Sequence, residues 1–301
     1  MHEQSPKAYS AAIEKIEHLL EIERWKLAEQ EVLSLLAEGT TPELLVLLAR
    51  CRFGREDWDG ARVEAKRALE LDPEDIDAHT VLAAACIQLG QHRRAETHLL
   101  EALRIDPLDV RALYFYSGLM LRTGHLEKAE KLVRRALALD AMHSPSHGLL
   151  ARILSEKKKR GEALAAGKTS VRLAANEEHS HANLGASYLE SGHPFLARRH
   201  LREAVRLDPS NTAVLECYLF ADRACRVLFL PFYYWSLLVD RLPGKQFAVW
   251  GGFLALCLVI LPALGAEGIG RSIFLVYVLV CLYTWVASPL TSLWIRMRPP
   301  K

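Results

Sequence analysis

Two stretches of this 301-residue chain follow one pattern: LGQHRRAETHLLEALRIDP at residues 89–107 and SGHPFLARRHLREAVRLDP at residues 191–209. Each begins near a glycine, carries alanines at helical spacing and ends in Asp-Pro. A third Asp-Pro pair precedes them, so the prolines of the three pairs are Pro73, Pro107 and Pro209. Their positions differ by 34 and by 102, which is three times 34, so the chain repeats with this period. Such a period predicts a stack of similar units rather than one closed domain.

Small residues occupy three columns at this period. The columns are Ala61, Ala95, Ala129, Ala163 and Ala197; Ala68, Ala102, Ala136, Ser170 and Ala204; and Ala49, Ala83, Ser117, Ala151 and Gly185. A small side chain at a fixed position lets two helices approach closely. Gly90, Gly124 and Gly192 recur where a left-handed residue would end a helix. The pattern therefore predicts a helix–turn–helix hairpin in each unit.

This pattern resembles the tetratricopeptide repeat (TPR), a helix–turn–helix unit of about 34 residues. The resemblance covers residues 42–211 and implies an all-α solenoid of about five to six hairpins, wound into a right-handed superhelix. The unit at 144–177 departs most from the family pattern, because it lacks the terminal proline and carries four basic residues, 157–160, at its turn. That basic run has three interpretations: a contact with anionic lipid, a contact with nucleic acid, or a solvated turn, which we favour.

Both ends of the solenoid have segments that suit a cap. Residues 1–41 contain two short apolar helical faces and are interpreted as a degenerate capping hairpin. Residues 212–226 are predicted to form a last helix that covers the final hairpin. The expected domains are thus a cap at 1–41, five repeats at 42–211 and a capping helix at 212–226, followed by segments 227–245 and 246–301.

Charge divides the chain near residue 222. Residues 1–222 hold 30 basic and 34 acidic residues, whereas residues 223–301 hold eight basic and two acidic ones. Two stretches of this tail, 247–266 and 272–295, have no charged residue, and each is long enough as a helix to span a hydrocarbon core of ~30 Å. We therefore expect two transmembrane helices, with the basic residues outside them holding both termini in the cytoplasm. A pair of buried core helices is the alternative.

A short apolar segment precedes the first of these stretches. Residues 227–239 are too few to span a bilayer. Phe232, Tyr233, Tyr234 and Trp235 are residue types that sit at the level of lipid headgroups. We expect an interfacial helix within 227–245, and a helix packed on the last repeat is the alternative.

Motifs of catalysis and metal binding are absent from the sequence. It has no GxSxG, HExxH or P-loop motif and no metal-ligand spacing of cysteine and histidine. His79, His147 and His181 share one column of the repeat, but successive hairpins are too far apart for them to ligate one ion. We therefore expect no enzymatic activity, no metal, no cofactor and no small-molecule substrate. The acidic balance of residues 1–222 argues against nucleic-acid binding.

The resemblance implies that the first helix of each hairpin lines a concave groove. The groove residues it implies are Arg50, Asp77, Thr80, Arg111, Tyr114, Arg152 and Asn183. A surface of cations, one aromatic ring and small residues suits an extended peptide or a partner helix. Chaperone-binding TPR domains hold two carboxylates in a clamp, but here Arg111 falls on one clamp position while Val46, Val81 and Phe115 occupy others.

The expected function is that of a membrane-anchored adaptor or scaffold, which binds a protein or peptide partner in the groove on the cytoplasmic side. The layout favours a bacterial inner membrane, with the lipid bilayer as the second partner. The alternative is a subunit or assembly factor of a membrane complex in which the transmembrane hairpin is the functional part. Small residues such as Gly251 and Gly252 would then allow close helix contact.

Overall fold

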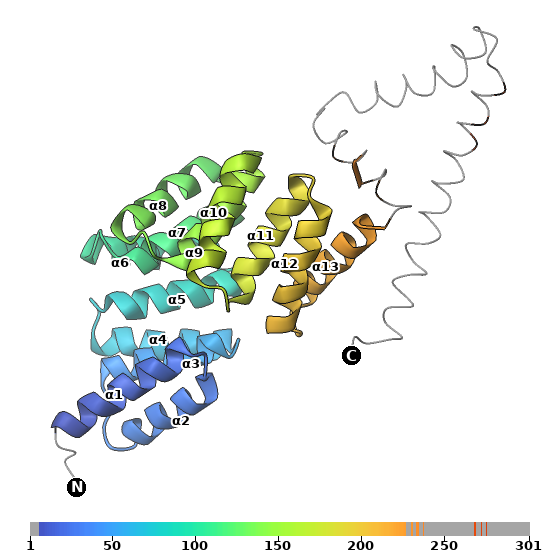
Figure 1. Cartoon of the computed structure of the whole chain (residues 1–301). Coiled ribbons are helices and arrows are strands. Elements are labelled where there is room, and N and C mark those ends of the chain that lie inside the picture. The colour runs from blue at the N-terminus through green and yellow to red at the C-terminus, as the bar shows by residue number, and fades with distance from the viewer. Residues whose placement is uncertain are drawn as a thin grey trace. The chain divides into compact units, whose positions relative to one another are not determined.

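The computed structural model describes residues 6–226, with side chains from residue 9, and the single positions 230, 233, 234, 237, 268, 272 and 275. Residues 6–226 form thirteen helices and no strand (Figure 1). The helices are α1 (Pro6–Glu21), α2 (Trp25–Leu36), α3 (Pro42–Gly54), α4 (Trp58–Leu71), α5 (Ile76–Gln88), α6 (His92–Ile105), α7 (Val110–Arg122), α8 (Leu126–Leu139), α9 (Ser144–Glu156), α10 (Arg160–Leu173), α11 (Glu178–Glu190), α12 (Pro194–Leu207) and α13 (Thr212–Ala224). The chain divides into two compact units, Met1–Arg226 and Val227–Lys301.

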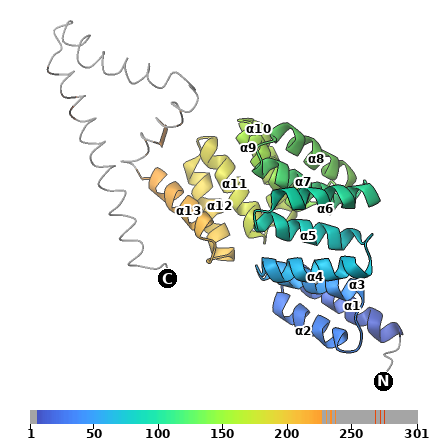
Figure 2. The same cartoon turned by 180° about the vertical axis from the view of Figure 1, so that it is seen from behind.

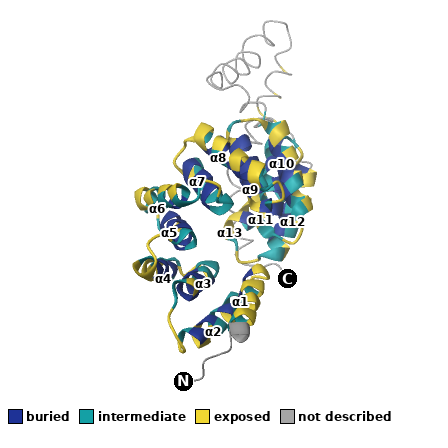
Figure 3. Cartoon of the chain, turned by 90° about the vertical axis from the view of Figure 1, so that its left-hand side faces the viewer, coloured by how far each residue is buried: buried dark blue, intermediate teal, exposed yellow. Residues whose placement is uncertain are grey.

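Consecutive helices of the first unit pair as hairpins, from α1 with α2 to α11 with α12, and each hairpin packs on the next (Figure 1, Figure 2). α13 packs on α12 and ends the stack. Every alanine and serine of the three small-residue columns is at most 1% exposed. The buried faces of the helices turn toward one another and the exposed faces turn outward (Figure 3). The predicted all-α solenoid of stacked hairpins is confirmed.

The turn inside each of the six hairpins holds one residue with a positive φ. In three turns this residue is the predicted glycine, with φ values of +72°, +80° and +85° at Gly90, Gly124 and Gly192. In the other three it is Glu23, Glu56 or Lys158, with φ of 57°, 62° and 60°. A non-glycine residue in this conformation costs roughly 1 kcal/mol or more. The packing of the two helices therefore imposes the turn even where glycine is missing.

Two columns of polar side chains hold the loops between hairpins. In the first, a carboxylate accepts a hydrogen bond of 2.8–3.0 Å from the backbone N–H two residues later, at Asp72, Asp106, Asp140 and Asp208. In the second, a side-chain oxygen caps the next helix three residues later, at Asp75, Asp109 and Asn211. Asp140 keeps its hydrogen bond although Ala141 replaces the proline. The loop before α11 has Ala174 and Glu177 in these columns, and Glu177 makes no such cap.

The apolar core is divided along the solenoid. A central cluster takes its buried members from residues 49–166, and a separate C-terminal cluster takes them from residues 184–221. A seam of buried serines lies between them: the Oγ atoms of Ser170 and Ser180 are 2.8 Å apart, and Ser144 Oγ lies 3.4 Å from each. A Cβ atom on Gly148 of α9 would lie 2.9 Å from Asn183 Nδ2 of α11. In the atypical unit at 144–177, glycine and small serine side chains therefore let α9 and α11 lie close together.

Most of the predicted membrane segments lie outside the described residues. This is true of Phe232, Trp235 and both predicted spans, except for positions 272 and 275. Tyr233 is buried and Tyr234 is 47% exposed. No helix among the described residues combines the length and apolar character needed to cross a bilayer. The interfacial helix and the two spans stay predictions.

Candidate functional site

The implied groove residues lie on the first helices of successive hairpins. Arg50 lies on α3, Asp77 and Thr80 on α5, Arg111 and Tyr114 on α7, Arg152 on α9, and Asn183 on α11. We call the surface formed by α3, α5, α7, α9 and α11 the first-helix face. Residues one repeat apart meet on this face, because the Asp77 carboxylate forms an ion pair with the Arg111 guanidinium.

Charges from several hairpins act on the middle of the first-helix face. Burial lowers the pKa of the Arg111 guanidinium, and the positive charge of Arg50 lowers it further. Burial raises the pKa of the Tyr114 hydroxyl, an effect that Arg152 opposes. Residues from α3, α7 and α9 therefore share one electrostatic environment, although they come from three different hairpins.

Aromatic rings form the floor of this face. The ring of Phe53 on α3 lies 6.4 Å from that of Phe115 on α7, so the two rings meet although α5 comes between these helices in the stack. Tyr114 lies edge-on to Phe115 at 5.2 Å and to His143 at 5.6 Å. The sequence analysis did not single out Phe53. The only sequence signal for Phe53 was its position three residues after Arg50 on the same helix, and this spacing fits a core residue as well as a surface residue.

Thr80 and Asn183 differ from the arginines in what they offer a ligand. Thr80 is only 2% exposed, and its hydroxyl is buried without a hydrogen-bond partner among the described residues. Asn183 is half-buried beside Gly148. Arg50 is half-buried and Arg152 is exposed, and neither forms an ion pair or side-chain hydrogen bond within the described part of the chain. The two arginines are therefore the cations of the first-helix face that have no side-chain partner among the described residues, whereas Glu156 of α9 and Glu190 of α11 are carboxylates without an ion pair there.

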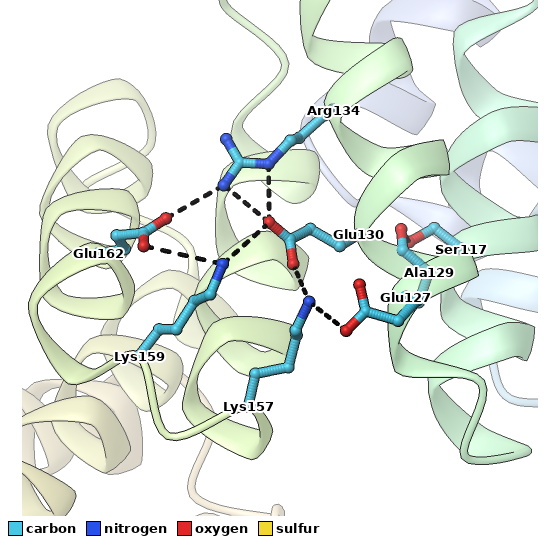
Figure 4. A network of polar contacts seen from close by, with 8 residues as sticks. All are labelled: Ser117, Glu127, Ala129, Glu130, Arg134, Lys157, Lys159 and Glu162. Carbon is cyan, nitrogen blue, oxygen red and sulfur yellow. Dashed lines mark hydrogen bonds and ion pairs between the residues drawn. The ribbon is translucent and has the colours of Figure 1, made fainter.

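Two lysines of the basic run at 157–160, Lys157 and Lys159, pair with carboxylates of the preceding hairpin (Figure 4). Lys157 Nζ lies 2.7 Å from Glu127 Oε1 and 2.5 Å from Glu130 Oε2. Arg134 binds the other oxygen of Glu130 at 2.9 Å and also pairs with Glu162 at 3.1 Å. The hydrogen bond from Lys157 is the main reason that the pKa of Glu130 falls to about 2. Lys157 consequently ties two hairpins together, which the sequence analysis did not predict, while Lys158 and Lys159 are exposed, as in the solvated turn that we favoured.

Two histidine pairs recur at equivalent places in the repeat. The Nδ1 atoms of His79 and His98 are 3.1 Å apart, and so are those of His181 and His200, three units later. His79 Nε2 donates to the Pro73 carbonyl, so its Nδ1 is left to accept from His98. The pair is therefore complete when both rings are neutral. The sequence analysis compared histidines between hairpins and missed these pairs, which form between the two helices of one hairpin.

These pairs predict that acid destabilises the protein. Burial and the neighbouring histidine lower the pKa of His98 and of His200, so the unfolded chain binds more protons below pH 6.5 and stability falls as the pH is lowered. The pKa of His179 is raised by Glu178, which acts in the opposite direction at one site. Burial also lowers the pKa of His143, so three histidines contribute to the loss. We therefore expect the His79→Leu/His98→Leu variant to remove about a third of the loss in melting temperature between pH 7 and pH 5.

The third repeat supplies the design of that variant, because Leu113 and Leu132 occupy the equivalent positions there. The measurement is thermal unfolding by circular dichroism across this pH range, with His125→Leu at an exposed position as the control. An unchanged pH profile in the double variant would show that the pairs do not carry the effect.

A cavity of about 230 Å³ lies between α6, α7 and α8. Two of its charged groups satisfy each other: the Tyr116 hydroxyl donates to Glu96 at 2.9 Å, and Lys128 pairs with both of these residues. His92 and Arg93 also line the cavity, and His92 Nδ1 is buried without a hydrogen-bond partner among the described residues. The described residues contain no group of three or more histidine, cysteine or acidic side chains placed to hold a metal ion. The first-helix face therefore stays the better candidate site.

Comparison with known proteins agrees with this geometry. The family model of the tetratricopeptide repeat matches residues 52–109 and 95–153. The chain contains tetratricopeptide repeats. TTC0263, a TPR protein of Thermus thermophilus, superposes with a TM-score of 0.55 at 19% identity, over 60% of this chain and 98% of that one. Pseudomonas aeruginosa pilF gives a TM-score of 0.50 at 20% identity, over 70% of this chain and 96% of that one.

Comparison with curated proteins gives no significant match. At these identities the solved structures support the fold alone. TPR proteins are in general scaffolds for protein interactions, since stacked repeats offer an extended surface to protein or peptide partners.

Proposed function

We propose that this chain is a membrane-anchored adaptor, which uses its TPR solenoid to hold an extended segment of a partner protein against the first-helix face. The anchor would be the two uncharged stretches at 247–266 and 272–295, with the solenoid on the cytoplasmic side. A bacterial inner membrane suits this layout.

The observation that carries the proposal is the composition of the first-helix face. Two arginines without ion pairs in the described structure, Arg50 and Arg152, flank the aromatic floor of Phe53, Tyr114 and Phe115. Aromatic rings and arginine are the residue types that dominate binding energy at protein interfaces. The basic run and the Glu96–Lys128–Tyr116 group are less available to a partner, because their charged side chains already form ion pairs within the chain.

The test places a photoreactive residue at Tyr114 of the full-length chain in native membranes. We expect defined crosslinked partners at this position and none at Leu100, which is exposed on α6 and serves as the control. An identical set of products at both positions would contradict binding on the first-helix face. Release of the intact chain from membranes by a carbonate wash at high pH would separately contradict the anchor.

A further inference from the structure

We infer that the first-helix face binds an extended acidic segment of about eight residues, with a carboxylate near each end and an apolar residue between them. The two carboxylates would meet Arg50 and Arg152, and the apolar residue would pack on the ring of Phe115. This inference rests on the proposed function and names the chemistry of the partner.

The charge of the face favours an acidic occupant. Arg111 is neutralised by its ion pair with Asp77, whereas Arg50 and Arg152 have no such partner in the described structure. Asp75 and Glu17 raise the pKa of Arg111, and Glu177 raises that of Tyr114, but each acts more weakly than burial and than the nearby Arg50 or Arg152. A carboxylate of the partner at each arginine would supply the missing charge-assisted hydrogen bonds.

The spacing of the repeat sets the length of the occupant. Arg50, Ala84, Gly118 and Arg152 occupy one column in four successive repeats, so two arginines enclose two of the smallest side chains. Adjacent helices pack at 8–10 Å, so three steps separate the arginines by roughly 24–30 Å. An extended chain advances ~3.3 Å per residue, so roughly seven to nine residues bridge the two arginines.

The middle of this column has room for the occupant. A Cβ atom built on Gly118 meets no atom within 4 Å, so the surface is open at this point. The contact between Phe53 and Phe115 across α5 gives the segment an apolar floor on the N-terminal side of Gly118. Gly118 therefore leaves space for the segment, whereas Ala84 of the same column is buried, and the rings supply contact area.

Two other occupants fit less well. The tail of this same chain carries eight basic and two acidic residues, so its charge has the same sign as the two arginines. Nucleic acid has the right charge, but residues 1–222 are acidic overall, which opposes the broad phosphate contacts that such binding needs. A partner protein with a short acidic stretch matches a site that has only two separated cations.

The experiment measures binding of labelled nine-residue peptides to the purified full-length chain by fluorescence anisotropy. The probe is Glu-Ser-Ser-Ser-Phe-Ser-Ser-Ser-Glu, and its two comparison peptides carry Gln or Lys in place of both Glu residues. We expect the Glu peptide to bind about tenfold more tightly than the Gln peptide, because two charge-assisted contacts are lost in the latter. Arg50→Ala/Arg152→Ala should lower the affinity for the Glu peptide by about tenfold or more. Arg172→Ala, at an exposed position on α10, is the control.

Three further variants separate binding from folding. Gly118→Leu fills the open middle of the column and should block the Glu peptide, whereas Gly161→Leu, which also meets no atom within 4 Å but lies on α10, should not. Arg50→Glu/Arg152→Glu should reverse the preference toward the Lys peptide. Circular dichroism melting identifies any variant that fails to fold. If a variant does fail, the Arg50→Glu/Arg152→Glu result still tests the inference, because a misfolded chain would not gain affinity for the Lys peptide.

The outcomes distinguish this inference from the proposed function. Equal binding of the Glu and Gln peptides, blocked by Gly118→Leu, would overturn the acidic preference and leave the adaptor function intact. Preference for a single-stranded oligonucleotide over the Glu peptide would overturn the inference in favour of nucleic acid. No binding of any peptide would overturn it as well, and the crosslinks at Tyr114 would then show whether the proposed function fails with it.

Discussion

A leucine in place of Ala102 is expected to destabilise the solenoid by about 1–3 kcal/mol, because it adds three carbon atoms to a packed contact between helices. Ala102 lies on α6, is completely buried and belongs to the central core cluster. It stands in a column whose five members are all alanine or serine, at one position of each hairpin. Each hairpin packs only on its neighbours, so a displaced α6 would also disturb its contact with α7.

The measurement for Ala102→Leu is urea unfolding of the full-length chain followed by the helical circular dichroism signal. Ala138→Leu makes the same change at an exposed position of α8 and should alter stability by no more than about 0.5 kcal/mol. If both variants unfolded at the same urea concentration, the close approach of helices at the small-residue column would not limit stability.

Leu201→Ala should remove about 2–5 kcal/mol of stability, through lost burial and the cavity left behind. Leu201 on α12 is 1% exposed and packs against Gly185 of α11, where a Cβ atom would lie 2.6 Å from Leu201 Cγ. We expect the loss to be local, because the C-terminal cluster is separated from the central one by the serine seam. Amide hydrogen exchange should therefore accelerate in α11–α13 and change little in α5–α8.

Leu196→Ala on the same helix is the matched control, since Leu196 is 42% exposed and should tolerate the change. Equal acceleration of exchange in α5–α8 and α11–α13 would mean that the solenoid unfolds as one cooperative block. The serine seam would then be a continuous part of the core rather than a boundary.

The candidate site was predicted in part. The resemblance to the tetratricopeptide repeat implied that Arg50, Arg111 and Arg152 lie on the first helices of their hairpins, and the structure places them on α3, α7 and α9. The resemblance did not reveal that Asp77 neutralises Arg111, that Thr80 is buried, or that Phe53 reaches Phe115 across α5. Each of these depends on how far a side chain extends past its neighbours, which a column of residue types does not specify.

The amino-acid sequence alone determined that residues 42–211 are a stack of helical hairpins, because small residues recur in register over five units and turn glycines and Asp-Pro pairs each recur three times at the same period. Only the tertiary structure decided which polar groups meet. Lys157 pairs with Glu127 and Glu130 of the preceding hairpin, and His79 with His98 of its own. Periodicity sets the backbone of every unit, but a long polar side chain takes its partner from whichever helix lies within a few ångströms, and that is known only once the hairpins are stacked.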